Sequence, residues 1–319
     1  MQPLFNVPGE GGYAFIMGII SGYPVGAKIV SDFYENKVCT KNEAERLLAF
    51  TNNSGPLFII GTVGILLFGN SNIGILLFFT HLLSSITVGI ILGIISRHCN
   101  TTKNNNTLTK YMVSKNTSQQ INSSLSDLGN ILSTSISKSI STVLQIGGFV
   151  VLFSVILSIL NKLNIIDFFS TIFNYIHIPK EISKSLISGI LELTNGVSLA
   201  SNLHTKNISI NIILCAFLLG FGGFSVLLQV LGIISKVGLS IKNYFYGKLL
   251  QGLIASLYTS IFIEKVPFFK LDLPTYSDSI NYNYVSIFLL FLIIISICFI
   301  FLNSKFRNKK TSSSYSLIN

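Results

Sequence analysis

The amino-acid sequence predicts an all-α, polytopic membrane protein with two inverted structural repeats and re-entrant helical hairpins. Half of its 319 residues are hydrophobic and only 11% are charged, whereas a soluble domain has about a quarter charged residues. Long stretches such as 47–96 carry no formal charge, and a membrane-spanning helix needs about 20 apolar residues. In addition, two separate places in the chain match each other at one constant spacing.

Six segments are expected to cross the membrane, because each is long, apolar and almost free of charge. They are 47–68, 72–96, 139–160, 208–234, 243–263 and 284–304. Two further segments, 11–27 and 185–205, are apolar but rich in Gly and small polar residues, and they are too short or too interrupted for a simple crossing. Backbone that leaves the helix at membrane depth must be buried in protein or face water. Both segments are therefore predicted to be re-entrant hairpins.

One offset relates the two halves of the chain. Residues 20–22 recur at 187–189 (187 − 20 = 167), and four residues within 47–55 recur within 214–222 (214 − 47 = 167). The matched pairs are Ile20 and Ile187, Ser21 and Ser188, Gly22 and Gly189, Leu47 and Leu214, Ala49 and Ala216, Phe50 and Phe217, and Gly55 and Gly222. The competing interpretation is coincidence in a low-complexity apolar sequence. We interpret the shared register as an internal repeat.

The distribution of Lys and Arg, which favour cytoplasmic loops, predicts the orientation. Three segments rich in these residues are expected inside, namely 97–138, 236–248 and 305–319. The segment 264–283 has more acidic residues than lysines and is expected outside. Residues 28–46 are then expected inside. Three predicted crossings separate them from the corresponding residues 195–213, which are therefore expected outside. An odd number of crossings makes the two copies inverted, as in many secondary transporters.

These assignments divide the chain into six parts. They are a first repeat at 1–96, a basic polar cytoplasmic loop at 97–138, a second repeat at 139–263, an outer loop at 264–283, a transmembrane helix at 284–304 and a basic cytoplasmic tail at 305–319. The formal net charge of +10 is explained by the cytoplasmic segments rather than by nucleic-acid binding.

In the first half, two motifs place helix-breaking and polar residues at membrane depth. The motif ISGYPVGAK (20–28) frees backbone groups for binding, and the lysine at its end could attract an anion or lie at the membrane interface. The motif TNNSGP (51–56) is costly in hydrocarbon unless it binds water or a ligand, although its side chains could instead join helices. The candidate substrate-binding residues are Ser21, Gly22, Tyr23, Lys28, Thr51, Asn52, Asn53 and Ser54.

In the second half, Glu192 is the only acidic residue between positions 185 and 205. An intramembrane carboxylate is a functional candidate, so we expect Glu192 to couple transport to a proton or cation. A structural hydrogen bond and a place at the interface are the alternatives. The further candidates for substrate binding are Thr194, Asn195 and Ser225.

The sequence predicts no cofactor, no metal site and no enzymatic activity. The four Cys and four His residues lack metal-ligand spacing. Phosphate-binding, dinucleotide-binding and GxSxG motifs are absent from the sequence, so neither ATP drive nor hydrolysis is supported. His81 could relay protons, but a neutral histidine that is hydrogen-bonded within the helix bundle is the favoured interpretation.

At these motifs the chain resembles the sporulation integral membrane proteins of the YlbJ type, within the wider group that has nucleoside-recognition (Gate) domains. The resemblance covers most of residues 7–263, and the family normally has additional N-terminal membrane sequence. It rests on SGYPVGAK (21–28), EAERLLAFTNNSGPLFIIGTVG (43–64), the segment around Glu192, FGGFSVLLQVLGI (221–233) and YGKLLQG (246–252).

The resemblance implies a multi-pass protein of the mother-cell-derived outer forespore membrane, or otherwise of the cell membrane. It implies a permease that moves a small anionic or aromatic polar solute into the developing spore by alternating access, and the family's proposed cargo is dipicolinic acid. The alternatives are a nucleoside-type or other small-solute transporter and a non-transporting assembly factor for the spore envelope. The expected partners are the solute, the lipid bilayer, and a second copy or other sporulation membrane proteins.

Overall fold

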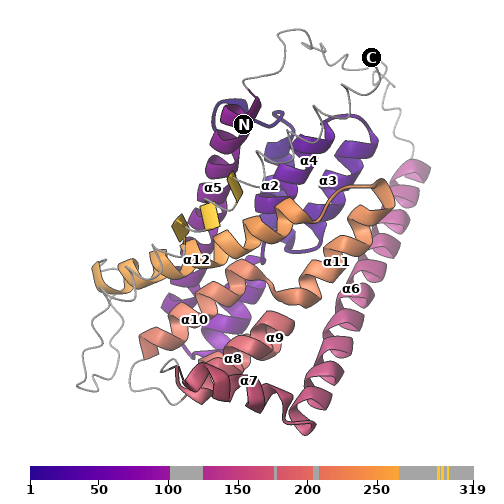
Figure 1. The fold of residues 1–319 in the computed structure, drawn as a ribbon. Coiled ribbons are helices and arrows are strands. Elements are labelled where there is room, and N and C mark those ends of the chain that lie inside the picture. Colours follow the sequence, from indigo (N-terminus) through magenta and orange to yellow (C-terminus); the bar gives the residue numbers. More distant parts are fainter. Residues whose placement is uncertain are drawn as a thin grey trace, which may run out of the picture.

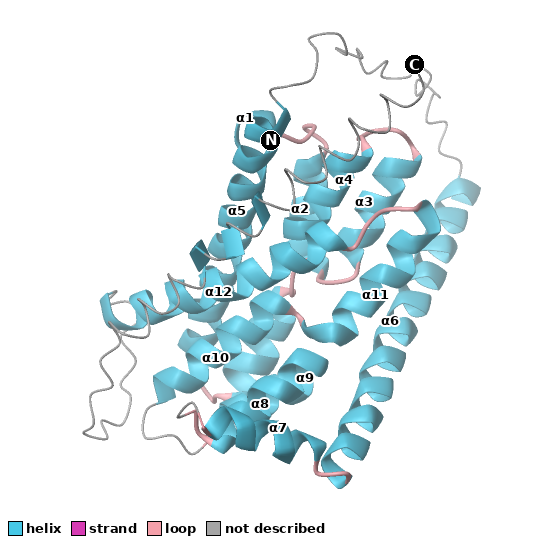
Figure 2. Ribbon diagram, viewed as in Figure 1, coloured by secondary structure: helices cyan, strands magenta, loops and turns pink. Residues whose placement is uncertain are grey.

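The computed structural model describes residues 1–100, 125–175, 178–203 and 208–265, together with a few positions between 293 and 301. Helices are the regular elements of these residues (Figure 2), which confirms the predicted all-α class. Apart from those few positions, the predicted helix 284–304 and tail 305–319 lie outside the described residues. Most of the predicted outer loop and positions 101–124 of the predicted cytoplasmic loop also lie outside them.

The first half contains a short leading helix, a helical hairpin, a broken helix and a long helix. The two hairpin helices pack against each other. The broken helix begins with a capping box, in which the Thr40 side chain accepts from Glu43 N and the Glu43 carboxylate accepts from Thr40 N. The elements are α1 (Gln2–Phe5), the hairpin α2 (Gly11–Ser21) and α3 (Val25–Glu35), the broken helix α4 (Lys41–Thr51) and η1 (Leu57–Leu67, a π-helix), and α5 (Ser71–Asn100).

The second half has the same order of a hairpin, a broken helix and a long helix. Two further helices connect the halves, and one of these, α6, runs along one side of the molecule (Figure 1). The elements are α6 (Leu125–Lys162), α7 (Ile165–Asn174), the hairpin α8 (Lys180–Leu191) and α9 (Leu193–Ser201), the broken helix α10 (Ile208–Phe221) and α11 (Gly223–Ile234), η2 (Ser235–Val237) and α12 (Lys242–Lys265).

The bounds of these elements agree with the offset found in the sequence. Subtracting 167 from the bounds of α9, α10 and α11 gives 26–34, 41–54 and 56–67. The corresponding elements of the first half, α3, α4 and η1, occupy 25–35, 41–51 and 57–67. Elements of the same kind therefore occur at the same positions of the 167-residue register in both halves.

Each broken helix is interrupted at Gly or Pro. Helix α4 ends at Thr51 and the next helix begins after Pro56, because a proline ring disfavours helical backbone in the residue before it and lacks an N–H group. Helix α10 ends before Gly222 and Gly223, both with positive φ (85° and 77°), which glycine adopts without strain. The predicted crossings 47–68 and 208–234 are therefore both interrupted, the first of them at the motif TNNSGP (51–56), where helix-breaking residues are expected.

Three segments of the described residues are long and apolar enough to cross a membrane: Ser71–His98, Leu128–Lys162 and Ile208–Val237. They contain three of the predicted crossings, namely 72–96, 139–160 and 208–234. Helix α6 begins at Leu125, so the described residues 125–138 of the predicted polar loop are helical. The same helix is largely exposed, with apolar side chains such as Leu144 and Val151 on its surface.

Two apolar clusters form the core, and a polar band lies between them. Along α5, Ile73 and Leu77 belong to one cluster and Val88 and Leu92 to the other. Between them lie four buried polar residues, Thr80, His81, Ser84 and Ser85. Along the broken helix, the stretch 51–54 is polar and buried in the same way, between Phe50 of one cluster and Ile59 of the other.

The two halves meet in a polar junction and an apolar junction. In the polar junction, Glu45 of α4 accepts hydrogen bonds from Ser240 N (3.1 Å) and Asn243 Nδ2 (3.5 Å) at the start of α12. The apolar junction consists of the three positions that correspond to these residues in the repeat register (45 + 167 = 212, 240 − 167 = 73, 243 − 167 = 76). All three are apolar and belong to one core cluster. They are Ile212, Ile73 and Leu76, all fully buried.

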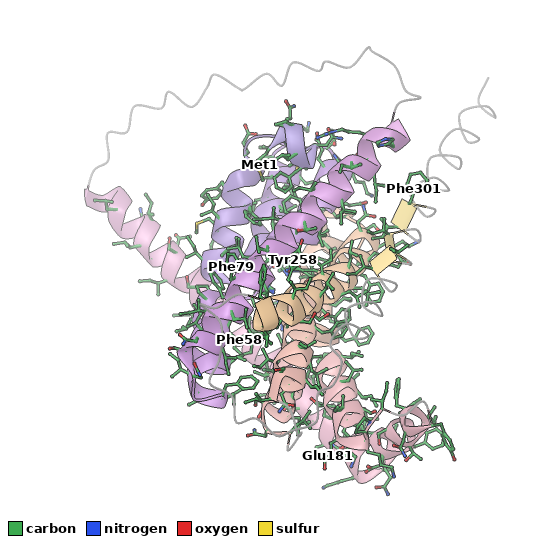
Figure 3. All side chains as sticks on the ribbon, turned by 90° about the vertical axis from the view of Figure 1, so that its left-hand side faces the viewer. Met1, Phe58, Phe79, Glu181, Tyr258 and Phe301 are labelled. Atoms are coloured by element: carbon green, nitrogen blue, oxygen red, sulfur yellow. The ribbon has the colours of Figure 1, made fainter. Side chains whose placement is uncertain are left out.

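Figure 3 shows that Met1 and Glu181 lie at opposite ends of the molecule. Met1 lies at the start of the first half, and Glu181 lies in the first turn of α8, where the hairpin of the second half begins. In Figure 1, α2 to α4 accordingly occupy the upper part of the molecule and α8 to α10 the lower part.

Candidate functional site

The break in the first broken helix carries three buried polar side chains. Asn52, Asn53 and Ser54 are 1–2% exposed, and they lie where the helix has no regular backbone hydrogen bonding. Asn52 connects the break to two other helices, because its Nδ2 donates to Tyr244 Oη (3.0 Å) and its Oδ1 accepts from Ala27 N (3.4 Å). The break is thus held between α3 and α12.

Asn53 binds a buried lysine from α12. The Lys248 side chain is 4% exposed, and its Nζ donates to Asn53 Oδ1 (3.1 Å) and Gln251 Oε1 (2.7 Å). Gln251 Nε2 also donates to Asn53 Oδ1 (2.9 Å), and Lys248 Nζ lies 5.9 Å from the centre of the Tyr244 ring. Two amide oxygens therefore accept two of the three N–H groups of the ammonium.

Lys248 has no carboxylate partner among the described residues. The ion pair found there joins Lys184 to Asp167, which are partly exposed and lie in the second half. A buried ammonium without a counter-charge is costly in a low-dielectric interior, even when amide oxygens accept its hydrogen bonds. This part of the polar band therefore favours an anion.

His81 faces the same break from α5. Its Nε2 accepts a hydrogen bond from Ser54 N (3.3 Å), and Gln251 Nε2 lies 3.5 Å from its carbonyl oxygen. Within the described residues, His81 Nδ1 and Ser54 Oγ are buried atoms without a hydrogen bond. The Tyr23 side chain lies close to Ser54, but in no hydrogen bond of normal geometry with its Oγ.

The second hairpin holds a different polar group at its turn. Glu192 is 1% exposed and is the N-cap of α9. Its carboxylate accepts from Thr194 N (3.0 Å), Thr194 Oγ1 (2.5 Å) and Asn195 N (2.8 Å). An N-terminal turn stabilises a carboxylate through its free N–H groups and the helix dipole. The structural hydrogen bond that was the alternative role for Glu192 is thus an N-cap of α9. Ion coupling by Glu192 stays a prediction.

The other predicted residues are distributed over several contacts. The Lys28 ammonium donates to Thr142 Oγ1 of α6, and Asn195 Nδ2 donates to Ser154 of the same helix (2.9 Å). The Thr51 hydroxyl donates to Leu47 O within α4 (2.8 Å), which leaves it less available to a solute.

Ser21, Gly22 and Ser225 also lie outside the polar network around Lys248. Ser21 is exposed at the end of α2, and Ser225 is buried in α11. Gly22 lies against the backbone of Gly55, where a Cβ would come within 3.1 Å of Gly55 N. From the predicted set, the structure thus gathers Asn52, Asn53 and Ser54, with Tyr23 beside them.

The inspection of the sequence missed Lys248 and Gln251. Lys248 was counted among the basic residues of the segment 236–248, although it also falls within the predicted crossing 243–263, and the structure buries its side chain in α12 (Lys242–Lys265). A signal was available in the repeat register, since Lys248 falls on His81 (248 − 81 = 167) and Gln251 falls on Ser84 (251 − 84 = 167). The two positions in the polar band are equivalent in the two halves.

Comparison with known proteins shows the family. The chain is 34% identical over 269 residues to the sporulation integral membrane protein YlbJ of Bacillus subtilis (strain 168). The chain belongs to the YlbJ family. The match covers 82% of this chain and 66% of the relative, so the chain spans about two thirds of the length of that protein. With its long apolar helices, this member of the YlbJ family is an integral membrane protein of sporulation.

No family model matches the chain, and no solved structure matches it. Evidence on how a YlbJ protein could act therefore comes from the site itself.

Proposed function

We propose that the chain is a sporulation membrane permease that moves a small anionic solute, with dipicolinic acid as its cargo, into the developing spore. The observation that carries the proposal is the buried ammonium of Lys248, which has amide partners but no carboxylate partner in the described part of the chain. An anionic solute would supply the missing counter-charge. Membership in a family of sporulation membrane proteins fits this cargo.

Alternating access requires two halves that can close around the solute from either side. The proposed inverted repeat is supported by the agreement of helix bounds with the 167-residue register. It is also supported by the positions of Met1 and Glu181 at opposite ends of the molecule (Figure 3). Lys248 and His81 then belong to symmetry-related helices that meet at the polar band.

The two hairpins are proposed to be re-entrant. Helices α2 and α3 have 11 residues each, which corresponds to a length of about 16 Å, whereas the hydrocarbon core of a bilayer is about 30 Å thick. The helices of the second hairpin have 12 and 9 residues. Each pair would enter and leave on the same side, with its turn near the middle of the membrane.

The outer forespore membrane is the proposed location, and no cofactor or enzymatic step is part of the proposal. A second candidate function is that of an assembly factor for the spore envelope, for which helix α6 would supply the contact surface. The apolar stretch of this helix is only 11% buried, so it presents a long apolar surface that a partner protein, a second copy or lipid would cover.

The decisive experiment measures uptake of labelled dipicolinate into vesicles that contain the purified chain. We expect saturable uptake and competition by dipicolinate but not by uridine. Lys248→Gln should raise the half-saturating concentration at least about 30-fold, since removing one partner of a buried charge pair costs about 2–5 kcal/mol.

Lys242→Gln is the matched control, because Lys242 is exposed on the same helix and its loss should leave uptake unchanged. Absence of saturable uptake by the unchanged chain would contradict the permease and favour the assembly factor. Uridine uptake without dipicolinate uptake would identify a nucleoside-type carrier instead.

A further inference from the structure

The hydrogen bond between Ser54 and His81 fixes the proton position on the histidine ring. A backbone N–H can only donate, so Ser54 N donates to His81 Nε2 at 3.3 Å, and Nε2 uses its lone pair as the acceptor. In a neutral imidazole the other nitrogen then carries the hydrogen. His81 therefore presents Nδ1–H as a donor.

This donor has no acceptor among the described residues. His81 is 3% exposed, and Nδ1 is fully buried without a hydrogen bond. The hydroxyl oxygen of Ser54, in a side chain that is 2% exposed, is also buried without one. Unsatisfied buried polar atoms are rare in folded proteins and call for a specific explanation. Two of them at adjoining residues indicate that a polar ligand group completes the site.

The polar band thus contains two places that need an acceptor. One is the Lys248 ammonium, which has two amide partners and one remaining N–H. The other is His81 Nδ1–H, beside the Ser54 hydroxyl that the Tyr23 side chain approaches. Gln251 and Asn53 hold these places at a fixed separation, since Gln251 Nε2 donates to Asn53 Oδ1 (2.9 Å) and lies 3.5 Å from His81 O.

We propose that His81 is a second recognition residue, which donates its Nδ1–H to one acceptor group of the solute while Lys248 binds an anionic group at the other end. The site would accordingly select ligands with two separated acceptor groups, such as a dicarboxylate, over ligands with one. This inference rests on the proposed function of the same site. It adds a residue and a selectivity to that function.

The test compares two ligands that differ by one carboxylate, pyridine-2,6-dicarboxylate and pyridine-2-carboxylate. Their dissociation constants are measured by calorimetry on the full chain in detergent, for the unchanged protein and for variants. The unchanged protein should bind the dicarboxylate at least about tenfold more tightly, because a site with buried donors rejects an analogue that leaves them unpaired.

Replacing His81 should remove this preference selectively. His81→Phe is expected to weaken dicarboxylate binding about tenfold and to leave monocarboxylate binding unchanged, whereas Lys248→Gln should weaken both. His81→Asn, whose amide N–H can replace Nδ1–H, should restore part of the preference. His98→Phe is the matched control, since His98 is exposed on the same helix. Thermal unfolding without ligand checks that each variant is folded.

An unchanged preference in folded His81→Phe, or no greater preference in folded His81→Asn than in His81→Phe, would overturn the inference and leave the proposed permease intact. Equal binding of the two ligands by the unchanged protein would overturn it as well. If the preference depends on His81 but vesicles show no uptake, the recognition role stands and the permease fails. If neither ligand binds and no uptake occurs, both are overturned.

Discussion

Glu192 is held by the first turn of its own helix. Three donors from Thr194 and Asn195 satisfy its carboxylate, so its burial does not require a bound cation. The sequence could show that this acidic residue is unusual in an apolar segment. It could not show the cap, because the break between α8 and α9 at Glu192 has no Gly or Pro to mark it.

Glu192→Ala is expected to lower the free energy of unfolding by about 1–2 kcal/mol, since it removes a charged N-cap. Thermal unfolding in detergent measures this loss, with Glu181→Ala, exposed in the first turn of α8, as the control. Glu192→Gln keeps an acceptor oxygen but loses the charge. Normal stability with lost uptake in Glu192→Gln would favour ion coupling, and normal uptake would leave the cap as its role.

Asn53 and Lys248 show how far residue-level prediction reached. Asn53 was predicted because a run of polar residues within an apolar stretch is conspicuous. Lys248 was overlooked because exposed lysines, including Lys236 and Lys242, precede it closely, and a loop charge count cannot separate the first inward-facing turn of a helix from the loop before it. The role of its partner Gln251 could not be predicted from the sequence, because it depends on the position of α12 beside Asn53.

At the scale of elements, the helices of the second hairpin touch through glycine. A Cβ on Gly196 of α9 would lie 2.0 Å from Gly189 Cα of α8, a distance that only glycine permits. Hydropathy predicted a hairpin over 185–205 but not its extent, since α8 begins at Lys180. Close packing of backbones depends on which faces meet, and a single apolar sequence does not specify those faces.

Gly196→Ala is expected to destabilise the protein by about 3 kcal/mol, because the added methyl group forces the two backbones apart. The matched control is Gly148→Ala in α6, where nothing lies within 4 Å of the new Cβ. The control should stabilise α6 slightly, since alanine is the better helix former. Melting temperatures of the purified variants measure both effects. Equal melting temperatures for Gly196→Ala and Gly148→Ala would contradict the close packing of α9 against α8.

At the scale of the whole molecule, the sequence predicted the order of the halves better than their spans. The repeat register was visible in seven matched residues, and it agrees with the bounds of whole elements. The break within 47–68 was indicated by Gly55 and Pro56, but hydropathy alone does not register it, because its polar residues are buried in protein. The C-terminal helix 284–304 and the basic tail remain predictions.

The inverted arrangement predicts opposite accessibility for two exposed positions. Asn36→Cys, between α3 and α4, and Asn202→Cys, after α9, should react with a membrane-impermeant maleimide from opposite sides of sealed vesicles. Each reporter is introduced into a chain in which Cys99, Cys215 and Cys298 are replaced by Ala. Labelling of both reporters from the same side would contradict the inversion.

Cys39 can be kept in this experiment as an internal control. Burial, together with the carboxylates of Glu43 and Glu10, raises the pKa of the Cys39 thiol to about 12. Since the thiolate is the reactive form, Cys39 should label slowly at pH 7 and faster only as the pH approaches that value. Its slow reaction leaves the signal to the reporter.

Because one junction between the halves is polar and the other apolar, opening them should change the heat capacity by different amounts. Parting Glu45 from Ser240 and Asn243 exchanges hydrogen bonds in the protein for hydrogen bonds to water, whereas parting Ile212 from Ile73 and Leu76 hydrates hydrocarbon. Hydration of apolar surface raises the heat capacity, and hydrophobic closure weakens on cooling. In a protein that opens at either junction, cooling would thus favour opening at the apolar one, so temperature alone would bias the side to which the site is exposed.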